Sequence, residues 1–426
     1  MTLKDGSIEK TVKIFELLDK EGVISDNEGA TREQLLLKDL KVIAKDYLDI
    51  EEIKKSFSRI ILKNLEELDF ETFKKSPRFY IKEDSIINSV SASNIRGLNV
   101  VSVDGSSVTK RFMNADFSFL KAIGVKYFFH QNHVASIKHF PDLAGFNNYI
   151  VEGNFFNQDE TTVDVKTSIN MKRMEIRLVN ELIETKSEID LIIIDGSIVI
   201  TPINLLFSKD AEISEKYDIL LKEYHKLYLN CKEKDIILIG SIKDTRTSAL
   251  SNLLSDAIQL LMPSYSKLSD FIKINYREAL KYFSDIDLFD RLLKKTERSC
   301  IFYCKKEIDK IRDTGIKKEI PYYFPLTFYA FYLKTAKFDT PCRIEFFMDE
   351  THSIEKAAEK ADLISSILLP ISSLNENYGL PIPQIEAHKR AVFKPNEVEI
   401  LLNNLTRTLR LHGVSLLEKR RNRRPF

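Results

Sequence analysis

The stretch LIIIDGSIVI, residues 191–200, is a run of aliphatic residues that leads into Asp-Gly-Ser. The stretch NVVSVDGSSV, residues 99–108, repeats this arrangement. Each run has the length and composition of a buried strand. Asp-Gly is also a common turn dipeptide, so each stretch taken alone indicates a turn, after which residues 107–112 return as a strand. Together the two stretches predict central strands that carry Asp104 and Asp195 to one edge of a sheet, where open α/β sheets form their sites.

The remaining segments predict a mixed α/β sheet covered by helices on both faces. Strands are indicated by β-branched and aromatic runs, and helices by apolar residues at helical spacing. The order of three strands, helix, strand, helix and strand is that of the ribonuclease H-like fold, although other α/β folds share it. The predicted strands are 98–104, 125–130, 148–156, 191–195, 235–241 and the aromatic stretch 321–349, and the predicted helices are 167–186 (capped by Thr167 or Ser168), 209–233, 248–315, 354–367 and a final section.

The composition is that of an ordinary soluble globular protein, with 43% hydrophobic and 30% charged residues. A net charge of +1 gives no bulk attraction for nucleic acid, so any basic surface has to be local. No apolar stretch reaches the roughly 20 residues that span a membrane, and the first residues do not resemble a secretory signal. The four scattered cysteines complete no zinc site and are expected to be reduced thiols. These features predict a cytoplasmic protein without membrane association.

A third carboxylate lies in the helix predicted between the two Asp-Gly-Ser stretches. Glu175 follows Met171 by four residues and precedes Leu178 by three, so it projects from the middle of an apolar stripe. An unpaired buried carboxylate is costly, and a partner is therefore implied. That partner is either a buried lysine or arginine, or a divalent metal shared with Asp104 and Asp195.

A cluster of carboxylates indicates metal-assisted phosphoryl transfer. Ligand sets made of oxygen suit Mg²⁺ or Mn²⁺. Two such ions about 3.5–4 Å apart can activate a water and neutralise the phosphate in transit. The sequence has no Walker loop and no GxGxxG, GxSxG or HExxH motif that would indicate another chemistry.

The segment NENYGLPIPQIEAHKRAVF, residues 375–393, adds a tyrosine before Gly-Leu-Pro and a histidine ten residues later. Taken alone, Tyr378 is a packing aromatic and His388 a surface or helix-capping residue. With this segment the chain resembles the NurA nuclease family. The family pattern has an Asp ending a first strand, a Glu in a helix, an Asp-Gly at a later strand end, and a late Tyr-Gly-x-Pro and Ala-His segment. The positions that match this pattern, in order, are Asp104, Glu175, Asp195, Tyr378 and His388.

The resemblance, which covers residues 97–393, implies a ribonuclease H-like DNA nuclease. It implies dependence on Mn²⁺ or Mg²⁺, with two ions held by Asp104, Glu175, Asp195 and His388. Expected activities are 5′→3′ exonuclease and single-strand endonuclease, on single- and double-stranded DNA. The family forms homodimers and works in DNA-end resection and repair with HerA, a hexameric translocating ATPase.

The resemblance also assigns roles to further side chains. His388 would bind the second ion or pass a proton to the leaving group. Tyr378 would orient the water or stack on a terminal base. IGSIKDTRTSAL, residues 239–250, is similar to the family's segment after the next strand, where Lys243 and Arg246 would face phosphate.

Three regions are expected: a helical region at 1–90, the nuclease core at 97–393 with a helical insertion at about 250–315, and a C-terminal helix with a basic tail at 394–426. Two rival hypotheses stay open. The chain could be a non-catalytic dimeric adaptor that holds a motor ATPase on DNA, although an adaptor has no need of costly buried carboxylates. It could also be a small-molecule phosphatase, although it lacks a DxDx[TV] nucleophile motif.

Overall fold

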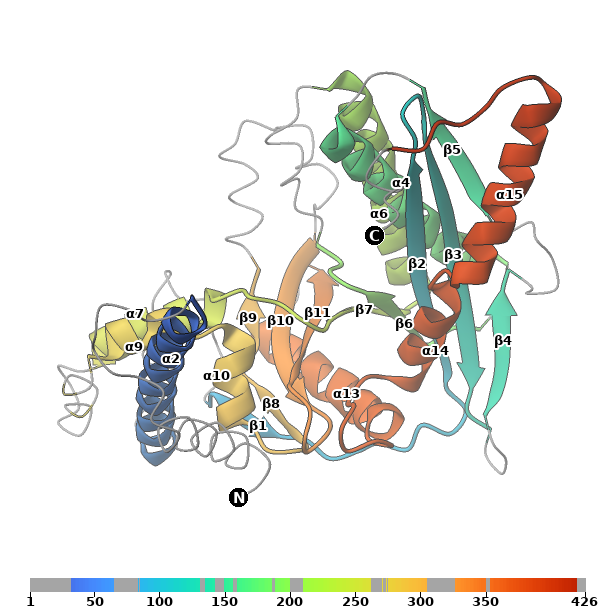
Figure 1. Cartoon of the computed structure of the whole chain (residues 1–426). Helices are drawn as coiled ribbons and strands as arrows, with labels where there is room; N and C mark the ends of the chain where they lie inside the picture. Colours follow the sequence, from blue (N-terminus) through green and yellow to red (C-terminus); the bar gives the residue numbers. More distant parts are fainter. Residues whose placement is uncertain are drawn as a thin grey trace. The chain divides into compact units, whose positions relative to one another are not determined.

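A computed structural model describes residues 32–64, 83, 85–130, 135–141, 149–155, 159–185, 188–199, 210–261, 270, 273, 275–304, 326–349 and 353–419. Its elements are drawn in Figure 1. The chain forms two compact units. The first comprises Met1–Leu65 and Leu254–Phe283, and the second comprises Glu66–Leu253 and Ser284–Phe426.

The first unit is helical in its described residues. It contains α2 (Arg32–Lys63), α9 (Tyr276–Lys281) and most of α7 (Ala249–Leu261). The buried ring of Phe57 lies 5.6 Å from the ring of Phe283, and Lys54 lies over that second ring. α2 lies in the region 1–90 that is expected to be helical, and residues 1–31 of that region lie outside the described residues.

The second unit is built on one mixed sheet. Within the described ranges, eleven strands pair in the order β1-β8-β10-β11-β7-β6-β2-β3-β4, and β5 pairs with β3 and β9 with β10. The strands are β1 (Ile87–Ser89), β2 (Asn99–Arg111), β3 (Asp116–Phe128), β4 (Ser136–Phe140), β5 (Ile150–Asn154), β6 (Leu191–Asp195), β7 (Ile237–Ile242), β8 (Glu297–Ser299), β9 (Phe302–Tyr303), β10 (Leu326–Lys334) and β11 (Cys342–Asp349).

The centre of the sheet matches the sequence expectation. β2 pairs with β6 and β6 with β7 in parallel, whereas β3 pairs with β2, β4 and β5 in antiparallel fashion. The mixed α/β class is confirmed, and helix and strand alternate from Glu160 to Ile242 as predicted, whereas β1 and β4 add to the three strands that were expected before this run. The helices of this unit are α4 (Glu160–Glu184), α6 (Ala211–Glu233), α10 (Asp285–Leu292), α13 (Ile354–Ser372), α14 (Ile382–Ala391) and α15 (Pro395–Leu411).

Helices cover both faces of β2 and β3, as Figure 1 shows. A side chain on Gly124 of β3 would meet Leu178 and Leu182 of α4. Its neighbours Ile123 and Val125 instead form a core cluster with residues of α14. Because successive residues of a strand face opposite sides of the sheet, α4 and α14 lie on opposite faces.

α15 covers β2 and β3 near the turn that joins them, where β2 ends at Arg111 and β3 begins at Asp116. Phe112, Phe117 and Phe119 form a buried cluster with Phe393 and Val398, against which apolar residues of α15 pack. The ammonium of Lys121 on β3 is also buried there. It lies 4.6 Å from the centre of the Phe393 ring and donates to Glu397 Oε2 at 3.0 Å.

The prediction of a turn at the first Asp-Gly is wrong. β2 runs on from Asn99 to Arg111 and pairs with β3 along its whole length, with Gly105 opposite Ala122. The backbone at this Asp-Gly is therefore satisfied by a strand partner, and no turn is required.

Two helix boundaries also differ from the prediction. α4 begins earlier than predicted, after Asp159, whose side chain accepts a hydrogen bond from Thr162 N at 2.8 Å. Thr167, one of the two predicted capping residues, lies inside the helix, where it is buried and bonds Ser118. The helix expected at 248–315 is interrupted by β8 and β9. Arg298 is 1% exposed and pairs with Glu83 and Asp362, which brings the apolar residues that follow it into the sheet.

No helix in the described part of the chain is long and apolar enough to cross a membrane.

Candidate metal centre

The site forms where β6 ends beside β2. Val103 of β2 pairs with Ile194 of β6, so the next residues along the parallel strands, Asp104 and Asp195, are neighbours. β6 stops at Asp195, whereas β2 continues for seven more residues to Arg111. Among the described residues, no strand pairs with this edge of β2 beyond Asp104, and side chains from both faces of the sheet can meet there.

His388 on α14 completes a cluster with the two aspartates. Its Nδ1 lies 2.8 Å from Asp104 Oδ2 and 3.9 Å from Asp195 Oδ2. One ligand atom from each of these three residues lies within 4.8 Å of the other two, which is close enough for one ion to reach all three. The carboxylate oxygens fit Mn²⁺ or Mg²⁺, and the imidazole nitrogen favours Mn²⁺, the transition metal of the two. The sequence predicted all three residues.

Burial and charge repulsion both affect the pKa of Asp104 in this cluster. Burial raises the pKa of Asp104, and the nearby Asp195 carboxylate raises it further. Hydrogen bonds from His388 and from Gly105 N offset part of this rise. Two carboxylates in this position favour a cation between them, because a cation removes both the repulsion and the cost of burial.

Glu175 approaches from the opposite face, on α4. It is 1% exposed, as its position in the apolar stripe predicted. A β-carbon on Gly105 would lie 2.6 Å from Glu175 Oε1, so the absence of a side chain on β2 is what admits this carboxylate. Glu175 is not part of the close cluster of Asp104, Asp195 and His388.

The partner of Glu175 in this structure is a lysine, one of the two alternatives left open by the sequence. Lys172 Nζ donates to Glu175 Oε2 at 2.6 Å. Burial raises the pKa of Glu175 to about 7, and although Lys172 lowers it, Asp104 and Asp195 raise it again. Because the charges of Asp104 and Asp195 raise the pKa of Glu175, its carboxylate interacts electrostatically with the cluster.

Two further side chains contact Asp195. Lys243, which the sequence placed near the site, donates to Asp195 Oδ2 at 2.7 Å. Gln384 on α14 is fully buried and donates to Asp195 Oδ1 at 3.1 Å and to Ser241 O at 3.5 Å. The sequence analysis missed Gln384. Its position one helical turn before His388 was the available signal, because residues four apart share a helix face.

Contacts with β7 and β11 hold the turn that follows Asp195. Gly196 has φ +105°, a conformation that favours glycine. A β-carbon on Gly240 of β7 would lie 2.7 Å from Gly196 O, so this position also needs glycine. Glu345 on β11 accepts hydrogen bonds from Ser197 Oγ at 2.5 Å and Ile198 N at 3.2 Å. These contacts fix the direction in which Asp195 leaves the strand.

Tyr378 and Arg246 lie at the surface. Tyr378 is 44% exposed, in the loop that precedes α14. That loop is anchored through Gly379, whose N donates to Asp339 Oδ2 at 2.7 Å and whose carbonyl accepts from Thr335. Arg246 is exposed in the segment after β7. Neither residue belongs to the close cluster.

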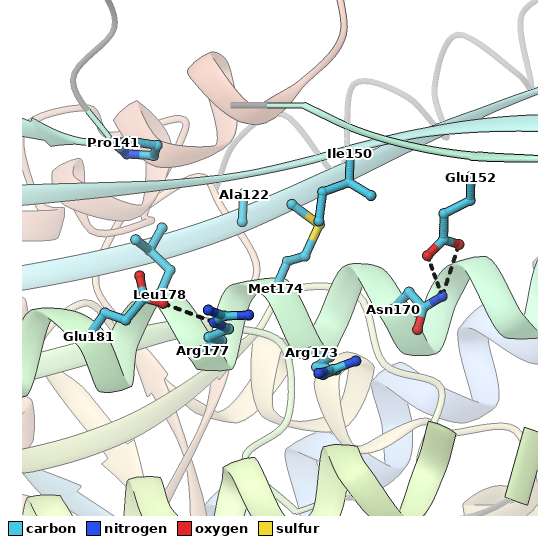
Figure 2. Close-up of a pocket in the computed structure, with 10 residues that line it drawn as sticks. All are labelled: Ala122, Pro141, Ile150, Glu152, Asn170, Arg173, Met174, Arg177, Leu178 and Glu181. Carbon is cyan, nitrogen blue, oxygen red and sulfur yellow. Dashed lines mark hydrogen bonds and ion pairs between the residues drawn. The ribbon is translucent and has the colours of Figure 1, made fainter. Parts of the chain in front are cut away.

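A separate pocket of about 420 Å³ lies between α4 and strands β3 and β5. Figure 2 shows Met174 pointing from α4 toward Ile150 of β5. Asn170 donates to both carboxylate oxygens of Glu152, at 2.7 and 2.8 Å. The described residues that line the pocket include none of those predicted to act in catalysis.

A mixed α/β sheet that gathers two aspartates and a histidine at a strand end defines a protein with a candidate divalent-metal site. Residues 98–393 match the NurA domain. The chain belongs to the NurA family of nucleases, as its sequence predicted.

One solved NurA structure shares the fold of this chain, and others are similar to it. The NurA nuclease from Sulfolobus solfataricus is 15% identical, with a TM-score of 0.52 over 90% of this chain and 98% of that one. A second NurA structure is 14% identical, with a TM-score of 0.41 over 88% and 98%. A NurA structure with manganese is 13% identical, with a TM-score of 0.38 over 87% and 98%. No curated protein matches the sequence of this chain.

Proposed function

We propose that this protein is a metal-dependent deoxyribonuclease that hydrolyses phosphodiester bonds at the end of β6. The observation that carries the proposal is the convergence of Asp104, Asp195 and His388, from three elements, within reach of one ion. The proposed ion is Mn²⁺ or Mg²⁺. When bound, it supplies activation of water and neutralisation of the phosphate.

The residues have distinct proposed roles. Asp104, Asp195 and His388 hold the ion, and Glu175 joins them from α4 through the gap at Gly105. Lys243 would face phosphate, a role that its position 2.7 Å from Asp195 Oδ2 supports. Arg246 would contact DNA farther out.

His388 and Tyr378 have proposed roles beyond ligation. The side chain of His388 is 51% exposed, so it can pass a proton between the site and solvent. Tyr378 would stack on a terminal base or orient the water from its exposed loop.

The finer functional expectations are part of the same proposal. They are 5′→3′ exonuclease and single-strand endonuclease activity, two ions, single- and double-stranded DNA as substrates, a homodimer, cytoplasmic residence, and a HerA-type ATPase partner in DNA-end resection. The strand order β4-β3-β2-β6-β7 supports a ribonuclease H-like core within residues 97–393. Residues 1–90 and 394–426 are proposed as accessory regions.

Cleavage of single-stranded DNA labelled at either end tests the function, with Mn²⁺, Mg²⁺ or EDTA. Wild-type protein should cut with metal and not with EDTA, and the label that is lost first gives the direction. Asp195→Asn should lower the rate at least a hundredfold. Asp349→Asn is the matched control. Asp349 also ends a strand and its side chain is 18% exposed against 17% for Asp195, but β11 runs antiparallel to β7, so Asp349 lies at the other edge of the sheet.

Normal cleavage by Asp195→Asn would refute the assignment of the site. If wild-type protein neither cut DNA nor bound Mn²⁺, alone or with its ATPase partner, the non-catalytic adaptor would replace the nuclease.

A further inference from the structure

Lys172 connects two of the elements that build the metal centre. It lies three residues before Glu175 on α4. Its ammonium donates to Glu175 Oε2 at 2.6 Å and to the main-chain oxygen of Asp195 at 3.2 Å. A single side chain thus ties the helix carboxylate to the end of β6.

The two oxygens of Glu175 have different surroundings. Oε2 is bound by Lys172, whereas Oε1 lies on the β2 side, 2.6 Å from the position that a β-carbon of Gly105 would take. Gly105 directly follows Asp104. The carboxylate therefore has one anchored oxygen and one oxygen beside the strand that carries Asp104.

Resting on the proposed function, we propose that Lys172 is a positioning residue of the metal centre. By anchoring Glu175 Oε2 and the Asp195 carbonyl, it keeps Glu175 Oε1 directed at β2. Partners of this kind that orient a metal-ligating carboxylate set metal affinity, and their loss costs roughly 10- to 100-fold in binding.

Lys172 differs in this respect from Lys243. Lys243 occupies Oδ2 of Asp195, one of the two carboxylate oxygens that Asp195 could offer to an ion. Lys172 bonds a main-chain oxygen and one oxygen of Glu175, neither of which belongs to the close cluster. An ion that binds this oxygen would displace Lys243 and leave Lys172 in place.

Mn²⁺ binding measured from the electron paramagnetic resonance signal of the free ion tests this role without reference to activity. Lys172→Met should bind Mn²⁺ at least tenfold more weakly than wild type, and Lys172→Arg, which can donate to both oxygens, should recover most of this loss. In a Glu175→Gln background, Lys172→Met should change affinity less than twofold, because the ligating carboxylate that Lys172 orients is gone and its other partner is a main-chain oxygen. Lys226→Met is the control for net charge, since Lys226 is half exposed and pairs with Glu184 at the surface.

The outcomes separate the two proposals. Unchanged or tighter Mn²⁺ binding by Lys172→Met overturns the positioning role, and so does an equal loss in the Glu175→Gln background. Wild-type protein that binds no Mn²⁺ overturns the proposed function itself. Circular dichroism checks that each variant is folded. If Lys172→Met does not fold, Lys172→Gln, whose amide can occupy the space of the lysine side chain, replaces it in the same set of measurements.

Discussion

Gly105 determines whether α4 can bring a carboxylate to β2. An alanine there would place its β-carbon 2.6 Å from Oε1 and 2.9 Å from Cγ of Glu175. Both atoms belong to a side chain that is held by Lys172, so it cannot easily move away. We expect Gly105→Ala to lower Mn²⁺ affinity at least tenfold and to destabilise the fold by about 1–3 kcal/mol, the usual cost of overpacking. Calorimetric titration and urea unfolding would measure the two effects.

Gly124→Ala is the matched control for this substitution. Gly124 lies on the adjacent strand, and its new β-carbon would meet the flexible ends of Leu182 and Leu178 at 3.2 and 3.5 Å. It should leave Mn²⁺ affinity unchanged. Equal affinity losses in both alanine variants would show that the gap at Gly105 is not specific to the site.

At the residue scale, the sequence identified the proposed ligands but missed two side chains that contact them. Glu175 was found because a carboxylate inside an apolar stripe is costly and therefore informative. Lys172 was missed, although a lysine one turn away on the same helix is a natural partner for such a carboxylate. Gln384 lies 189 residues from Asp195 in sequence, and only the docking of α14 brings them together.

At the element scale, β11 supports the turn after β6 through a buried ion pair. Arg343 donates to Glu345 Oε1 through Nε at 3.0 Å, and both residues are almost completely buried. The other oxygen of Glu345 accepts from Ser197 and Ile198. Arg343→Met should destabilise the protein by about 3–5 kcal/mol, because it leaves a buried carboxylate without its cation.

Chemical denaturation of the single and double variants checks this prediction. Arg343→Met/Glu345→Gln removes both charges and should recover at least half of the lost stability. A loss below about 1 kcal/mol in Arg343→Met would contradict the importance of this pair.

The errors of prediction at this scale have a common cause. The Asp-Gly at 104–105 is a turn by local preference, but pairing of β2 with β3 across the full length of both strands overrides that preference. Residues 297–303 look helical beside a charged segment, yet Arg298 is neutralised by Glu83, which lies 215 residues earlier in the chain. Tertiary partners of this kind leave no local signal.

At the scale of the whole molecule, the four cysteines are buried thiols that form no disulfide with one another, in agreement with the expectation of reduced thiols. Burial raises the pKa of Cys231 and of Cys342 to about 12. Because the thiolate is the reactive form, these groups stay protonated and unreactive at pH 8. Ellman's reagent should therefore label less than one thiol per native chain and four in urea. Rapid labelling of the native protein would show that the core opens.

The fold class and the family could be predicted because they depend on ordered features spread along the chain. The Asp-Gly-Ser strands, the helix with Glu175 and the late histidine keep their order whatever the loops do. Site geometry could not be predicted to the same depth. That side chains from both faces of the sheet meet beside β2 follows from β6 ending seven residues before β2 does, which only strand register reveals.

The distance along the chain between Asp104 and His388 is 284 residues. During synthesis, the three carboxylates leave the ribosome long before His388 does. Until α14 emerges and docks, a nascent chain has the carboxylates without His388 and without the amide of Gln384. The three residues of the candidate metal centre can therefore come together only after almost the whole NurA domain has been synthesised.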